Sequence, residues 1–181
     1  MRKPCRIVPG WVGRLFSRLI VGGLVCGVLL MGASTGAWAA SVPPVLQAAI
    51  FKKVLSLTPD FAAKKKIAIA YTDGKDDALV MKKAFSGLGF EAALVKDYGL
   101  ITQAAELVYL VQTSNETESF CNKKRVLCFA GSVATVDSGF AEVAVGSRRN
   151  KPKIFLNLKR INFKGIKIRQ ELVQLSEVVE E

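Results

Sequence analysis

The 181-residue chain contains no histidine, only four cysteines and few aromatic residues. Without histidine, the commonest general base, the commonest zinc ligand and the Ser–His and Cys–His nucleophile pairs are excluded. Acidic residues are also scarce, 15 against 26 basic ones, and the formal net charge is +11. Hydrophobic residues make up 50% of the chain, which excludes a largely disordered protein. We therefore expect a small folded domain that is not a conventional hydrolase.

The first forty residues have the three parts of a secretory signal peptide. Residues 1–18 carry five basic side chains and no acidic one, residues 19–32 carry no charge, and Ala37-Trp38-Ala39 fits the signal-peptidase rule. As a helix, the uncharged run spans about 21 Å, which is short of the ~30 Å hydrocarbon core of a bilayer. We expect cleavage after Ala39, which leaves residues 40–181 as an exported domain. The alternatives are an uncleaved N-terminal anchor and a lipoprotein attached at Cys26.

Removal of residues 1–39 also changes the charge balance. It takes away five of the 26 basic residues and none of the 15 acidic ones, so the net charge falls from +11 to +6. A charge of this size is ordinary for a soluble domain and only weakly indicates an acidic partner. We do not expect an exported chain of this kind to bind nucleic acid.

The mature chain keeps two cysteines, Cys121 and Cys128. Two cysteines this close together in an exported protein indicate one local disulfide. The bond would join the end of a short helix to the strand that follows, and would stabilise the fold by about 2–3 kcal/mol. The alternative is a buried free thiol at Cys128 with Cys121 exposed.

Alternating strand and helix patterns fill the first two thirds of the mature chain. Helical spacing begins after Pro43-Pro44 and recurs after Asp73-Gly74, and apolar runs typical of buried parallel strands lie between and after these segments. The expected helices are residues 45–57, 76–88, a short connection at 101–105 and a short helix within 113–124; the expected strands are residues 65–72, 90–95, 107–111 and 126–130. Repeated β–α–β units of this kind form a parallel sheet covered by helices.

The C-terminal third follows a different pattern. Residues 142–146 and 153–158 flank a basic turn and predict an antiparallel hairpin, and residues 168–180 predict a closing helix with Leu172, Leu175, Val178 and Val179 turned inward. The predicted fold is a single three-layer α/β domain over residues 40–181. Its sheet is mostly parallel, with a C-terminal antiparallel hairpin and a closing helix.

Two loops that follow parallel strands are candidate ligand sites. Asp73, Asp76 and Asp77 surround the start of the second helix, where acidic side chains are also favoured by capping and by the helix dipole. The loop from Gly131 to Thr135 is small and rich in hydroxyl groups, but it also fits a turn that ends in a helix cap at Ser132. We detect no metal site and no catalytic group of residues.

Three basic runs precede strands or occupy the hairpin turn. They are residues 64–66, 123–125 and 148–151. Clusters at strand ends are commonly a solvated rim, and the functional alternative is contact with anionic lipid headgroups or an acidic partner.

Several motifs resemble the YfiR/HmsC family of bacterial periplasmic proteins. The opening helix and its proline (AAIFKKVLSLTPDF), the strand KIAIAYTD and the segment GLGFEAALV match the family's N-terminal half. In the C-terminal half, Asp137 follows a strand, Asn157 ends another, and Gly165 leads to the leucines Leu172 and Leu175. The chain departs from the family in having Thr58 where a tryptophan commonly precedes the proline. It also has Gly139-Phe140-Ala141 in place of a Gly-Gly-Met stretch.

The resemblance implies a non-enzymatic periplasmic protein with a local disulfide. Members of the family restrain a membrane-anchored diguanylate cyclase by binding its periplasmic part, and this couples cyclic-di-GMP and biofilm formation to envelope conditions. We therefore expect a regulatory protein whose partner is such a cyclase or another membrane sensor, with a homodimer as a further expectation. An exposed apolar face on the opening helix around Phe51 is the candidate contact. The alternative is a small-solute-binding module that uses the loops at 73–77 and 131–135.

Overall fold

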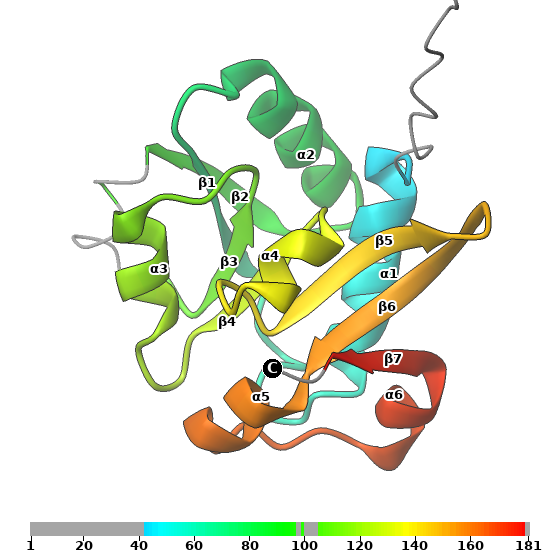
Figure 1. Ribbon diagram of the computed structural model, residues 1–181. Coiled ribbons are helices and arrows are strands. Elements are labelled where there is room, and N and C mark those ends of the chain that lie inside the picture. The colour runs from blue at the N-terminus through cyan, green and yellow to red at the C-terminus, as the bar shows by residue number, and fades with distance from the viewer. Residues whose placement is uncertain (1–41, 97–98, 100–104, 180–181) are drawn as a thin grey trace, which may run out of the picture. The chain divides into compact units, whose positions relative to one another are not determined.

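The computed structural model describes residues 42–96, 99 and 105–179 (Figure 1). From Trp38 to Glu181 the chain forms one compact unit. The predicted signal peptide at residues 1–39 lies outside the described residues, as does all but the last residue of the predicted helical connection at 101–105. None of the described helices combines the length and apolar character needed to cross a bilayer.

Helices and strands alternate as the sequence predicts. The elements are α1 (Pro44–Ser56), β1 (Lys66–Tyr71), α2 (Lys75–Gly87), β2 (Glu91–Lys96), β3 (Leu107–Leu110), α3 (Asn115–Cys121), β4 (Leu127–Ala130), α4 (Val133–Asp137), β5 (Val143–Arg148), β6 (Lys151–Asn157), α5 (Leu158–Lys164), α6 (Gln170–Leu175) and β7 (Ser176–Val179).

The strands form one seven-stranded sheet in the order β2-β1-β3-β4-β5-β6-β7. Every neighbouring pair is parallel except β5 and β6, which form the antiparallel hairpin expected from the sequence. Arg149 and Asn150 make its two-residue turn with φ angles of 52° and 60°. Two consecutive positive φ angles give the turn whose twist matches that of the flanking strands. The predicted α/β fold with a mostly parallel sheet is confirmed.

Two hydrophobic cores lie on opposite faces of this sheet, as strand alternation requires. On β3, Leu107 and Tyr109 belong to the core that α1 and α2 cover, whereas Val108 and Leu110 belong to the core beneath α3 and α4. All four side chains are buried. The apolar run that predicted a buried parallel strand is therefore covered on both sides, which is the basis of the three-layer arrangement.

The predicted closing helix is only partly correct. Helix α6 ends at Leu175, and the residues that follow form β7, which pairs in parallel with β6 at the edge of the sheet. Leu172 is buried as expected, but Leu175 is 54% exposed and Val178 is 41% exposed. Beta-branched residues such as Val178 and Val179 fit a strand better than a helix. The paired apolar positions therefore belong to two elements rather than to one helical face.

The buried faces of the first two helices differ from those that apolar spacing predicts. On α1, spacing at 46, 50, 54 and 57 predicts an inward Leu46, but Leu46 is 40% exposed and the buried residues include Gln47, Ala48 and Phe51. On α2, the spacing predicts an inward Leu79, which is 45% exposed. Because Phe51 is fully buried, the prediction that it forms an exposed docking face is wrong.

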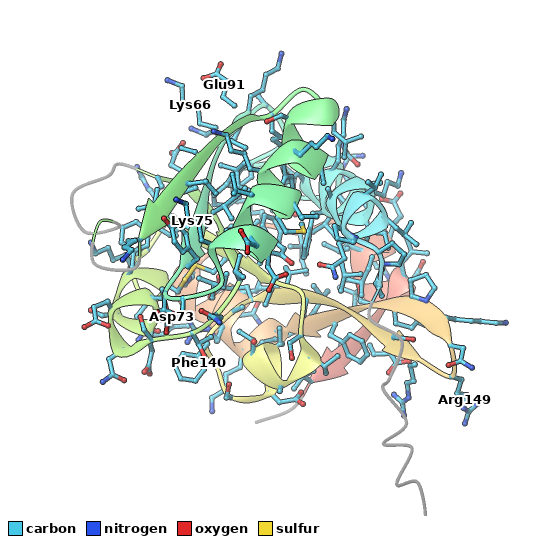
Figure 2. The ribbon with its side chains drawn as sticks, turned by 90° about the horizontal axis from the view of Figure 1, so that it is seen from above. Lys66, Asp73, Lys75, Glu91, Phe140 and Arg149 are labelled. Atoms are coloured by element: carbon cyan, nitrogen blue, oxygen red, sulfur yellow. A yellow bond between two sulfur atoms is a disulfide. The ribbon has the colours of Figure 1, made fainter. Side chains whose placement is uncertain are left out.

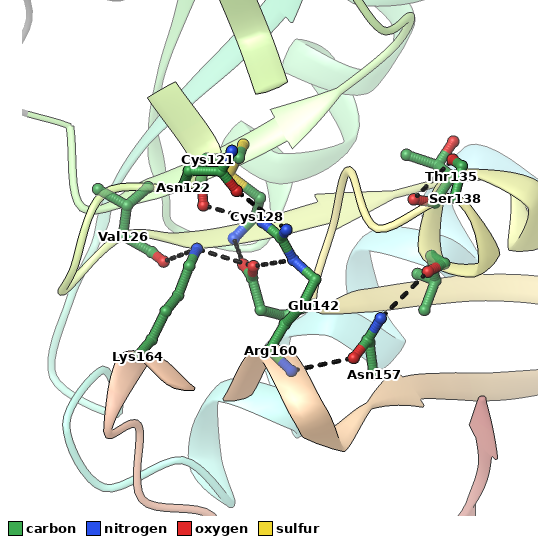
Figure 3. Close-up of polar contacts among 11 residues, drawn as sticks. Cys121, Asn122, Val126, Cys128, Thr135, Ser138, Glu142, Asn157, Arg160 and Lys164 are labelled. Atoms are coloured by element: carbon green, nitrogen blue, oxygen red, sulfur yellow. Dashed lines mark hydrogen bonds and ion pairs between the residues drawn. A yellow bond between two sulfur atoms is a disulfide. The ribbon is translucent and has the colours of Figure 1, made fainter. Parts of the chain in front are cut away.

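Helix α5 was not predicted, and a buried ionic cluster attaches it to the sheet (Figure 3). Glu142 is fully buried just before β5, and its carboxylate accepts hydrogen bonds from the Cys128 backbone N–H at 2.8 Å and from Arg160 Nε at 3.0 Å. Lys164 Nζ lies 2.7 Å from the same carboxylate and also donates to the Val126 carbonyl at 2.9 Å. Every partner of the carboxylate is thus a donor, which offsets the cost of burying its charge.

The ionic cluster also joins α5 to the loop between α3 and β4. Arg160 donates from its Nη1 to the Asn122 side chain at 2.9 Å and from its Nη2 to the Cys121 carbonyl at 3.1 Å. Asn157 caps the helix by accepting from the Arg160 backbone N–H at 3.0 Å. Burial lowers the pKa of Lys164, and the nearby Glu142 carboxylate opposes that shift. The position of α5 therefore depends on these contacts between charged and polar groups.

We expect substitution of Lys164→Met to lower the free energy of unfolding by about 3 kcal/mol. The variant removes one donor and leaves the buried Glu142 carboxylate with less compensation. Urea unfolding followed by circular dichroism measures the change. Lys159→Met is the matched control, because Lys159 is an exposed cation on the same helix. Equal stabilities of the two variants would contradict a stabilising role for the cluster.

Candidate functional site

The carboxyl ends of the parallel strands are the place where α/β sheets commonly bind ligands. In the sheet, β1 lies between β2 and β3. The chain thus adds β2 on one side of β1 and then β3 on the other side, which makes the boundary between β1 and β3 the topological switch point of the sheet. Gln112, in the loop after β3, lies at this switch point. Its side-chain oxygen accepts hydrogen bonds from the backbone N–H groups of Asp73 and Gly74 at 3.0 and 3.1 Å, and from the Thr72 hydroxyl.

The Gln112 contacts determine what this part of the edge can bind. Backbone N–H groups at the start of a helix are the groups that hold phosphates in nucleotide-binding folds. Here the N–H groups of Asp73 and Gly74 already donate to Gln112, so an anion would have to displace that side chain. The geometry therefore favours a loop that Gln112 holds in place over a phosphate-binding site at this point.

The three candidate carboxylates occupy different positions. Asp76 and Asp77 lie in the first turn of α2, where they are favoured by the helix dipole, as expected. The predicted capping role is not observed, because Gly74 is the N-cap residue and no side chain caps the helix. Asp73 lies beyond the carboxyl end of β1, near Lys75, at the opposite end of the strand from Lys66 (Figure 2). Asp77 also lines a pocket.

A pocket of about 380 Å³, here called the carboxyl-edge pocket, lies beside Asp77. Its walls come from the start of α1, the start of α2 and the loops after β3 and β4. The structure thus brings Asp77 together with Gly131, Ser132 and Thr135, which the sequence marked as two separate candidate loops. Ser132 occupies the N-cap position of α4 as predicted, but its side chain makes no cap hydrogen bond.

Two buried polar residues that sequence reasoning missed, Gln47 and Tyr109, also line this pocket. The Tyr109 hydroxyl donates to Gln47 Oε1 at 2.7 Å, and Gln47 Nε2 donates to the Val42 carbonyl at 2.8 Å. Burial, with a smaller contribution from the Asp77 charge, raises the pKa of Tyr109, so its hydroxyl stays protonated as the donor. A polar group within an otherwise apolar strand was the signal that could have identified Tyr109.

Gly131 allows the strand end to approach this polar pair closely. A Cβ atom at this position would lie 2.6 Å from the Tyr109 hydroxyl and 2.8 Å from Gln47 Oε1. Both distances are below van der Waals contact, so any side chain would push the pair apart. The glycine in the small-residue loop is thus explained by packing against the pair.

Four exposed apolar side chains lie on α1 and α2, the two helices whose first residues form part of the carboxyl-edge pocket. Val45 and Leu46 begin α1 and are 67% and 40% exposed, and Leu79 and Val80 on α2 are 45% and 51% exposed. Val80 lines the pocket itself, as does Pro44 beside Val45, and helices α1 and α2 pack together. We call these four side chains the apolar rim.

The cysteines lie away from this pocket. Cys121 and Cys128 form a disulfide with a Cα–Cα distance of 5.9 Å, which joins the end of α3 to β4. Both residues are fully buried, Cys121 as the last residue of α3 and Cys128 on the face of β4 that α3 covers. Within the described part of the chain, no three His, Cys, Asp or Glu side chains come together in a way that could hold a metal ion.

We expect substitution of Gly131→Ala to lower the free energy of unfolding by about 1–3 kcal/mol, because the new Cβ collides with the Gln47–Tyr109 pair. Gly87→Ala is the control, since no atom lies within 4 Å of a Cβ at that helix end. Adding Tyr109→Phe should recover part of the loss by removing the hydroxyl. A double-mutant cycle in urea measures this coupling, and strictly additive effects would contradict the collision.

The sequence matches no family model and no curated protein. Among the solved structures that share the fold are two proteins of low sequence identity. One is described as the ABC domain in complex with L-Trp from Streptococcus pneumonia, with a TM-score of 0.55 and 14% sequence identity. The other is a conserved domain protein from Vibrio cholerae O1 biovar El Tor, with a TM-score of 0.56 and 12% identity. Each alignment covers 76% of this chain and 60% of the other, so the chain spans about three fifths of each similar protein.

Proposed function

We propose that the chain is a non-enzymatic regulatory protein that acts by binding the periplasmic part of a membrane-anchored sensor. The apolar rim is the observation that carries this proposal. Single exposed hydrophobic side chains are common on protein surfaces, whereas a group of them on neighbouring helices is typical of a contact site. Val45, Leu46, Leu79 and Val80 form such a group on two helices that pack together.

The polar groups beside the rim support binding over catalysis. Tyr109 and Gln47 are hydrogen-bonded to each other, and Gln112 is bonded to the loop that begins α2. Each of these side chains therefore has a structural partner. The chain also has no histidine that could act as a general base at this edge. Because these polar groups are used within the fold, the exposed apolar side chains of the rim are the groups that remain for contact with a partner.

The class of partner follows from the family resemblance. The motifs around Asp137, Asn157 and Gly165 are similar to those of periplasmic proteins that restrain a diguanylate cyclase. In this proposal the rim contacts the periplasmic domain of the cyclase and keeps its cytoplasmic domain inactive. Loss of the contact would then raise cyclic-di-GMP in the cell.

A charged substitution on the rim tests this function. A photoreactive amino acid at Leu79 should crosslink in cells to a membrane protein that carries a cyclase domain. Val80→Glu should abolish this crosslink and raise cyclic-di-GMP, because burial of an unpaired carboxylate in the contact is unfavourable. Leu175→Glu is the matched control, since Leu175 is equally exposed at 54% but lies on α6. Wild-type crosslinking and wild-type cyclic-di-GMP in the Val80→Glu strain would refute the proposal.

The carboxyl-edge pocket favours a second candidate, a small-solute-binding module. Its volume of about 380 Å³ fits a small molecule, and Asp77 could accept a hydrogen bond from a solute amino group. A structure of similar fold is described as a complex with L-Trp. This similarity is one of fold alone. The case for solute binding therefore depends on the side chains that line the pocket.

Thermal unfolding with L-Trp and other amino acids distinguishes the two candidates. A bound solute at one hundred times its dissociation constant stabilises the folded state by about 2.7 kcal/mol. The solute candidate predicts a rise in melting temperature that Asp77→Asn abolishes and that Leu175→Glu, on α6 and outside the lining of this pocket, leaves unchanged. Unchanged melting temperatures with every amino acid at millimolar concentration would eliminate it.

A further inference from the structure

Basic side chains gather at the other end of the parallel strands. The first two basic runs directly precede β1 and β4, and parallel strands begin at the same edge of a sheet. Figure 1 shows that α5 and α6 lie at this end, with the loop between α3 and β4 beside α5. We call the exposed cations of this region the basic face: Lys123, Lys124, Arg125, Lys159 and Lys167.

Hydrogen bonds and a shared hollow bring together the segments that carry these cations. The ionic cluster holds residues 122–126 against α5 through Arg160 and Lys164. Arg125 and Lys167 line the same hollow of about 400 Å³, together with Lys64. The basic face therefore comes from two segments, residues 123–125 and 159–167, that are distant in the sequence and are held together by buried bonds.

The two acidic residues in this hollow already have partners. Glu106 forms an ion pair with Lys64 at 2.5 Å, and Asp60 accepts a hydrogen bond from the Lys167 backbone N–H at 2.9 Å. None of the ion pairs found among the described residues includes a side chain of the basic face. Lys123 Nζ lies 4.5 Å from the centre of the Phe120 ring, a contact that leaves its charge in place. Within the described residues, the positive charge of the face is therefore not cancelled by an ion pair.

An aromatic residue protrudes from the same surface. Phe163 on α5 is 72% exposed, more than any other large hydrophobic side chain in the described part of the chain. It lies four residues after Lys159, so both side chains lie on one side of the helix. A helix that presents an aromatic ring among cations is typical of proteins that rest on a lipid surface.

We propose that the basic face docks on a bilayer that contains anionic phospholipids, with Phe163 inserted among the headgroups. Lysine and arginine side chains then contact lipid phosphates, which attract each nearby cation over about one Debye length. An acidic protein partner fits less well, because stable protein contacts have a packed apolar centre inside a polar rim. This face has one exposed aromatic residue surrounded by charge.

This inference goes beyond the proposed function and does not depend on it. The basic face lies at the amino ends of the strands and the apolar rim at their carboxyl ends. A molecule that rests on the bilayer through the basic face therefore leaves the rim free. Failure of lipid binding would leave the sensor-binding proposal intact, and the reverse also holds.

Vesicle co-sedimentation tests the proposal with residues 40–181, which contain both hydrophobic cores of the compact unit. The protein should sediment with vesicles of phosphatidylglycerol and phosphatidylcholine, and much less with phosphatidylcholine alone. Added salt should release it, because the attraction is electrostatic. Lys123→Gln with Lys124→Gln should weaken binding at least about tenfold, and Phe163→Ala about fivefold.

The β5–β6 hairpin provides the matched control. Arg149→Gln with Lys151→Gln removes two cations from the turn, which the seven residues of β6 separate from α5 by roughly 23 Å. Figure 2 shows Arg149 at the tip of the hairpin. The control variant should bind vesicles as the wild type does, and all variants should retain the same urea midpoint.

Three results would overturn the proposal. The first is equal binding to neutral and anionic vesicles, and the second is equal loss of binding in the hairpin control. The third is full competition by soluble glycerophosphoglycerol or inorganic phosphate at the same phosphate concentration, which would indicate a site for a single anion. Binding to polyglutamate without binding to vesicles would assign the face to an acidic protein instead.

Discussion

The arrangement of the C-terminal third depends on one buried carboxylate. Glu142 receives bonds from the backbone of β4 and from two cations of α5, so a single side chain joins the sheet to a helix that follows it by sixteen residues. Burying such a charge costs several kcal/mol, and the cost is offset only when all its oxygen atoms have donors. Arg160 then extends the connection to the disulfide-bonded loop. The loop, the helix and the strand end are therefore positioned together.

The sequence was sufficient to predict most strands but not the contacts between distant polar residues. The runs at β3 and β4 are short, apolar and bounded by polar residues, which identifies buried parallel strands without any tertiary information. Helix α1 is apolar on most sides, so its spacing could not show that Gln47 faces inward. That residue is buried because Tyr109, 62 residues later, supplies its partner. Glu142 and Lys164 were missed for the same reason.

The C-terminal segment shows a second limit of pattern reading. Leucines at 172 and 175 and valines at 178 and 179 satisfy helical spacing, yet the chain leaves the helix after Leu175. The Ser176 hydroxyl donates to the Leu172 carbonyl at 2.6 Å. The edge of β6 offers backbone hydrogen-bonding groups with which the following residues pair as β7. A free strand edge is a tertiary feature that competes with local helix propensity. The outcome is an added strand where the sequence predicted a longer helix.

The C-terminal segment of the domain completes the packing around its first helix, α1. The Arg169 backbone N–H donates to the Leu57 carbonyl just after α1, and Leu172 belongs to the same core as Phe51. The Lys167 backbone bonds to Asp60 across 107 residues. Because a chain is synthesised from its N-terminus, α1 emerges long before the residues that complete its packing. Folding to the final state must therefore wait for nearly the whole chain, and such distant closures are slow.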